Sequence, residues 1–95
     1  MHLAKRLGLL AAVAILANSP NAHADPTSIN ILTGGTSGVY YPIGVALSQL
    51  YGNGIDGAKT SVQATKASVE NLNLLQAGRG ELALALADSV SDAWK

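Results

Sequence analysis

Residues 29–44 read INILTGGTSGVYYPIG, and this stretch decides the fold. Its first five residues, 29–33, are rich in β-favouring side chains and stop at a pair of glycines, which predicts a strand. Residues 35–41 are small, polar or aromatic and predict a loop. Pro42 fits the first turn of a following helix, where a backbone N–H is not needed. The stretch therefore predicts a strand–loop–helix unit.

The predicted helix after Pro42 has one apolar face with spacings of four and three residues. Gly52-Asn53-Gly54 predicts its end, and residues 60–65 predict a second, weaker strand. The apolar face consists of Ile43, Leu47, Leu50 and Tyr51.

Ser68 predicts the N-cap of a second helix, because Glu70 follows in the first turn, where the helix dipole favours an acidic side chain. Gly78 predicts the end of that helix. The predicted apolar face of this second helix consists of Val69, Leu72 and Leu75, with Gln76 on the same side.

Residues 82–87 alternate leucine with alanine and include no polar residue. Such a run is typical of a strand buried on both faces, although a helix is the alternative because leucine and alanine favour helices. The short length of the run favours the strand. Ser89 followed by Asp92 then predicts the start of a third helix. The order β-α-β-α-β-α predicts an α/β fold with a parallel sheet and right-handed crossovers.

The N-terminal segment, residues 1–24, has the order of a secretory signal. Lys5 and Arg6 are followed by the uncharged residues 7–17, by helix-breaking residues and by Ala22-His23-Ala24. An apolar run of 11 residues is too short for a membrane span, which takes about 20. We therefore expect cleavage after Ala24 and export to a bacterial periplasm, and a permanent membrane anchor is the weaker alternative.

Composition excludes several kinds of function. The 95-residue chain has no cysteine, and its two histidines, His2 and His23, lie in the predicted signal. The mature chain therefore lacks the residues for a Ser-His-Asp triad, a thiol nucleophile or a histidine-ligated metal. Without Lys5 and Arg6, four basic residues remain against six acidic ones, a formal net charge of −2. This charge argues against nucleic-acid binding, and we expect no cofactor.

Small polar residues follow each predicted strand, and the carboxyl ends of parallel strands share one sheet edge. Helix N-termini at this edge would offer free N–H groups, which suit a carboxylate or another small oxyanion. Each group also has a structural alternative: Ser68 and Ser89 as helix caps, and Asp88 as a cap instead of a partner for a ligand amino group. The glycine pair could simply form a tight turn. Phosphate-loop and serine-hydrolase motifs do not match.

The block 31–44, ILTGGTSGVYYPIG, closely resembles the opening of the mature TAXI-family receptors, the solute-binding subunits of tripartite ATP-independent periplasmic (TRAP) transporters. Residues 64–72, 75–78 and 81–89 also resemble that family. The resemblance covers almost all of residues 25–95, in order and with natural spacing.

The resemblance implies a periplasmic-binding-protein-like fold with two α/β lobes closing on a small organic anion, typically glutamate or a related carboxylate. Residues 25–95 would be the N-terminal part of the first lobe, from a truncated gene product or a fragment. It further implies a non-enzymatic, monomeric receptor that delivers its ligand to TRAP membrane subunits. The implied ligand-binding residues are Gly35, Thr36, Ser37, Tyr40, Thr65, Ser68, Asn71, Asp88 and Ser89.

Two other functions remain open on the sequence. One is a small exported structural or antigenic protein without a ligand, which would need a stable fold from 71 residues. The other is the N-terminal part of a secreted hydrolase, and the lack of a catalytic base argues against it.

Overall fold

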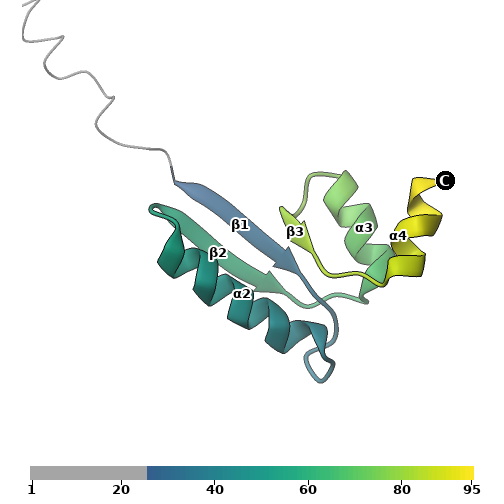
Figure 1. The fold of residues 1–95 in the computed structure, drawn as a ribbon, viewed down its shortest axis with the longest axis horizontal. Coiled ribbons are helices and arrows are strands. Elements are labelled where there is room, and N and C mark those ends of the chain that lie inside the picture. The colour runs from purple at the N-terminus through teal and green to yellow at the C-terminus, as the bar shows by residue number, and fades with distance from the viewer. Residues whose placement is uncertain (1–25) are drawn as a thin grey trace, which may run out of the picture.

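The computed structural model describes residues 26–95, so the predicted signal segment lies outside the described residues (Figure 1). Strands and helices alternate along the chain, as the sequence predicts. The elements are β1 (Thr27–Leu32), α2 (Tyr40–Gly54), β2 (Ala58–Gln63), α3 (Ser68–Gln76), β3 (Leu82–Ala83) and α4 (Ala87–Trp94).

The three strands form one parallel sheet in the order β2-β1-β3. The central strand β1 pairs with β2 along its whole length, from Thr27 opposite Ala58 to Leu32 opposite Gln63. Its pairing with β3 covers only two residues, Ile31 and Leu32. This arrangement confirms the predicted α/β class and is compatible with a partial lobe of the periplasmic-binding-protein type.

The two faces of the sheet receive different segments of the chain. A Cβ built on Gly44 of α2 would overlap the Thr33 methyl group and approach Val62 and Ile31. A Cβ built on Gly80, which follows α3, would lie 2.7 Å from the side chain of Leu32. Side chains alternate along a strand, so α2 and the segment after α3 cover opposite faces. The first crossover leads from β1 to β2, and the second leads from β2 back past β1 to β3. Crossovers of the usual right hand that run in opposite directions place their connecting segments on opposite faces of the sheet.

The core is small and lies around the end of β1. Ile31 and Leu32 are its fully buried apolar side chains, and Thr33 and Asn71 are buried beside them. The central strand supplies this core because it alone is paired on both edges among the described residues.

The predicted apolar helix faces are wrong in part. In α2 the buried residue is Gly44, whereas Ile43 is partly exposed and Leu50 is 68% exposed. The close approach of α2 to the sheet at Gly44 sets the orientation of the helix, and large apolar side chains would hold the two elements apart. In α3 the buried residues are Ser68 and Asn71, because polar contacts rather than leucines attach this helix to the strand ends.

The third strand is real but shorter than residues 82–87. The ladder stops at Ala83 because β1 ends at Leu32, whose carbonyl accepts a last hydrogen bond of 3.0 Å from the Leu84 N–H. Residues 84–86 are not helical, and Ala87 already belongs to α4. The two residues of β3 are half-buried rather than fully buried, since β3 has a paired neighbour on one side only among residues 26–95.

Two predicted N-caps are wrong. Ala67 occupies the N-cap position of α3 and Leu86 that of α4, and neither helix start carries a side-chain cap bond. The predicted end of α3 is confirmed, because Gly78 has a φ of +75°. The Arg79 N–H donates to the Leu74 carbonyl at 2.9 Å, which completes a Schellman motif.

We predict that Gly44→Ala destabilises the fold by about 1–3 kcal/mol, because the new methyl group would overlap Thr33. This loss would exceed the gain in helix propensity, which is about 1 kcal/mol. Gly54→Ala is the matched control, since its Cβ would meet no atom within 4 Å. Urea unfolding of both variants checks the prediction, and equal midpoints would contradict it.

Candidate functional site

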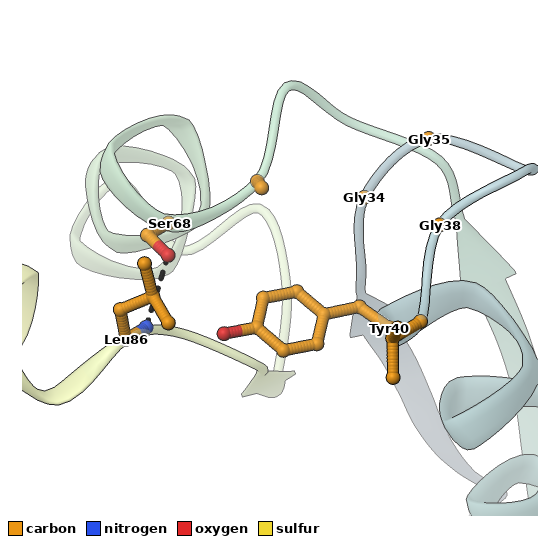
Figure 2. Close-up of a pocket in the computed structure, with 8 residues that line it drawn as sticks. Gly34, Gly35, Gly38, Tyr40, Ser68 and Leu86 are labelled. Carbon is orange, nitrogen blue, oxygen red and sulfur yellow. Dashed lines mark hydrogen bonds between the residues drawn. The ribbon is translucent and has the colours of Figure 1, made fainter.

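An open hollow of about 380 Å³ lies at the carboxyl edge of the sheet, where the three loops that precede α2, α3 and α4 meet (Figure 2). The strands are parallel, so their C-terminal loops share this edge. The predicted convergence of the three loops is therefore confirmed. The hollow is lined by Gly34, Gly35, Gly38, Val39, Tyr40, Ala67, Ser68 and Leu86.

The first loop forms a tight turn beside the hollow. The Gly38 N–H donates to the Gly35 carbonyl at 2.9 Å, which places Thr36 and Ser37 at the exposed tip of the turn. A Cβ on Gly34 would touch Ala67 and Tyr40. The missing side chain thus leaves space between the first loop and the second.

Tyr40 is the first residue of α2, and its side chain extends across the hollow. The hydroxyl points toward Ser68 and Leu86, which belong to the other two loops (Figure 2). A phenol can donate one hydrogen bond and accept others. Tyr40 therefore presents a polar group to any ligand held between the loops.

Ser68 connects the second loop to the third. Its Oγ accepts a hydrogen bond of 2.9 Å from the backbone N–H of Leu86. This contact gives the side chain a role other than helix capping, and it leaves the hydroxyl hydrogen available to donate to a ligand. The N-termini of α2 and α3 add backbone N–H groups that have no partner within their helices.

Ala67 has an unusual backbone conformation, with φ +73° and ψ −142°. A non-glycine residue rarely adopts it, because its Cβ crowds the backbone. Two bonds hold it there: its N–H donates to Thr65 Oγ1 at 3.0 Å, and its carbonyl accepts from the Asn71 N–H at 2.9 Å. The second loop is therefore fixed from below and lies against the hollow in a strained form.

Asn71 ties the ends of the three strands together. Its side-chain Nδ2 donates to the Thr33 carbonyl at 2.6 Å and to the Leu84 carbonyl at 2.8 Å. Its Oδ1 accepts a hydrogen bond of 2.5 Å from Thr65 Oγ1. The side chain is fully buried, so this network forms the support beneath the hollow.

The structure separates the nine predicted ligand-binding residues into four groups. Gly35, Tyr40 and Ser68 line the hollow, and Thr36 and Ser37 lie at the turn tip. Thr65 and Asn71 belong to the supporting network. Asp88 and Ser89 lie in α4, where the Asp88 carboxylate accepts from the Ser89 N–H at 2.7 Å. Ser89 lines a different hollow, between α3 and α4.

Five lining residues lie outside the nine predicted ones: Gly34, Gly38, Val39, Ala67 and Leu86. Val39, Ala67 and Leu86 are apolar, and each stands immediately before a helix. Their positions could have been inferred from the predicted helix starts, but their residue types give no signal of ligand binding.

The lining contains no charged side chain. Within residues 26–95 no group of three His, Cys, Asp or Glu residues could hold a metal ion. The hollow can therefore hold a ligand through hydroxyl groups, backbone N–H groups and apolar contacts. None of the helices in residues 26–95 has both the length and the apolar character to cross a membrane.

The fold and the hollow define an α/β ligand-binding domain. The profile of the NMT1-like family matches residues 31–95, which is most of the chain, so the protein belongs to that family. The family is of the periplasmic-binding-protein type, and its role is the binding of small-molecule substrates by proteins that are typically exported. No curated protein matches the chain.

We predict that Asn71→Ala destabilises the protein by about 2–4 kcal/mol, because the buried Thr33 and Leu84 carbonyls lose their donor. Asn73→Ala changes an exposed residue of the same helix and should shift stability by less than about 0.5 kcal/mol. Urea titration of the full chain compares the two. Similar losses in both variants would show that the network does not hold the strand ends.

Proposed function

We propose that the chain is the N-terminal part of the first lobe of a TAXI-type receptor for a TRAP transporter, and that it binds a small carboxylate such as glutamate or a related acid. The family membership supports a substrate-binding role, and the motif resemblance in residues 31–44 supports the TAXI type. The carboxylate ligand and the TRAP transporter go beyond the role that family membership supports.

One observation carries the proposal: the Tyr40 and Ser68 hydroxyls and two helix N-termini meet at one hollow. A carboxylate accepts several hydrogen bonds, and helix N-termini favour negative charge. Donors held in place by Asn71 and the tight first loop need little reordering when a ligand arrives, which favours binding.

The proposed receptor works outside the cytoplasm. Residues 1–24 would direct export to the periplasm and be removed, and residues 25–95 would form part of the mature protein. The monomeric receptor would pass its ligand to the TRAP membrane subunits without chemical change. Lobe closure around the ligand, as in other two-lobed receptors, would replace water with fixed donors and favour the closed form.

Calorimetry of the full chain with L-glutamate, glutarate and 4-methylpentanoate tests the ligand class. We expect at least one of these carboxylates to bind. Tyr40→Phe should weaken that binding by about 1–1.5 kcal/mol, or roughly tenfold, through loss of one hydrogen bond. Tyr51→Phe, at the other end of α2, should leave the affinity unchanged. Failure of all three acids to bind, or an unchanged affinity in Tyr40→Phe, would refute the proposal.

Expression of the full chain in a bacterium tests the export step. We expect the periplasmic fraction to contain a product that begins at Asp25, because Ala22 and Ala24 fit the small-residue pattern of a signal-peptidase site. Ala22→Arg should block processing, whereas Ala17→Gly should not. Edman sequencing identifies the new N-terminus, and an unprocessed product in the cytoplasm would contradict the prediction.

A further inference from the structure

Large apolar side chains stand at the opening of the hollow with much of their surface in water. Val39 is 72% exposed and Leu86 is 58% exposed, and they come from the first and third loops. Together with Ala67 and the ring of Tyr40, these two side chains form an apolar wall of the hollow. Covering exposed apolar surface with a ligand removes it from water and lowers the free energy of the complex. The wall therefore favours a ligand with an apolar body.

The absence of charged side chains from the lining favours a ligand with only one charged group. The eight lining residues include no aspartate, glutamate, lysine or arginine. Asp88, which the sequence offered as a partner for an amino group, lies in α4 and bonds to the Ser89 N–H. A ligand ammonium or a second carboxylate in this hollow would lose hydration without meeting an opposite charge from these residues.

A single carboxylate is the charged group whose need for hydrogen-bond donors this lining can meet. The hydroxyls of Tyr40 and Ser68 can donate to it, and they lie beside the apolar wall rather than opposite a charged side chain. The lining therefore has a polar part and an apolar part, as a small molecule with one carboxylate and a hydrocarbon body would require.

We propose that the hollow selects small monocarboxylates with an apolar body over dicarboxylates and amino acids. This inference rests on the carboxylate binding of the proposed function and ranks apolar monocarboxylates above glutamate as its ligands. The carboxylate lies against the Tyr40 and Ser68 hydroxyls, and the hydrocarbon part lies between Val39 and Leu86.

Four matched probes test the selectivity on the full chain by calorimetry. The first is 4-methylpentanoate; L-leucine adds an amino group to it, 4-methylpentanamide removes its charge, and glutarate replaces its apolar end with a second carboxylate. We expect 4-methylpentanoate to bind at least about tenfold more tightly than each of the other three.

Two variants test the apolar wall independently. Leu86→Ser and Val39→Ser change exposed side chains on separate loops, so both should fold, which circular dichroism checks. Each should weaken 4-methylpentanoate binding by about tenfold, with little change for glutarate. Leu50→Ser, an exposed residue of α2 outside this hollow, is the matched control and should change neither affinity.

The outcomes separate this inference from the proposed function. If glutarate or L-leucine binds as tightly as 4-methylpentanoate, or if both wall variants keep full affinity, the selectivity is wrong and carboxylate binding stands. If the amide binds as tightly as the acid and Tyr40→Phe has no effect, the apolar wall is real but the carboxylate function is wrong. If none of the four probes binds and L-glutamate binds, only the selectivity is wrong; if L-glutamate also fails to bind, both proposals fail.

Discussion

The carboxamide of Asn71 is the contact on which the geometry of the strand ends rests. It donates to the carbonyls that follow β1 and β3 and accepts from Thr65, which follows β2. Buried amide groups need all of these partners, because an unpaired donor or acceptor away from water costs free energy. One side chain of α3 thus fixes three loops that are up to 51 residues apart in the chain, from Thr33 to Leu84.

This polar support replaces much of the apolar packing that usually joins helices to a sheet. The core around Ile31 and Leu32 is small, and several large apolar side chains of the helices remain exposed. Two close contacts at glycines compensate for this small core. Gly44 lets α2 approach Thr33, and Gly80 lets the segment after α3 lie on Leu32. Hydrogen bonds and glycine contacts are directional and short-ranged, so they position the loops more closely than a loose apolar interface would.

Much of the fold could be predicted from local patterns. The strand 29–33, the glycine stop at Gly78 and the alternation of strands with helices were all visible in the sequence, and the structure confirms them with small shifts of the ends. The helix caps and the buried faces of the helices were not visible in the sequence. Ser68 has the residue type of an N-cap, yet its hydroxyl bonds to Leu86, eighteen residues away, and no local pattern signals such a contact.

The amino-acid sequence was sufficient to indicate the α/β class and the shared edge of the three loops, because these follow from periodicity and strand direction. Only the tertiary structure decided which loop residues face the hollow. In the folded chain Asp88 and Ser89 belong to α4, Asn71 and Thr65 form the supporting network, and the apolar Val39 and Leu86 line the hollow. The direction of a side chain is set by contacts between distant segments, and those contacts form only when the sheet assembles.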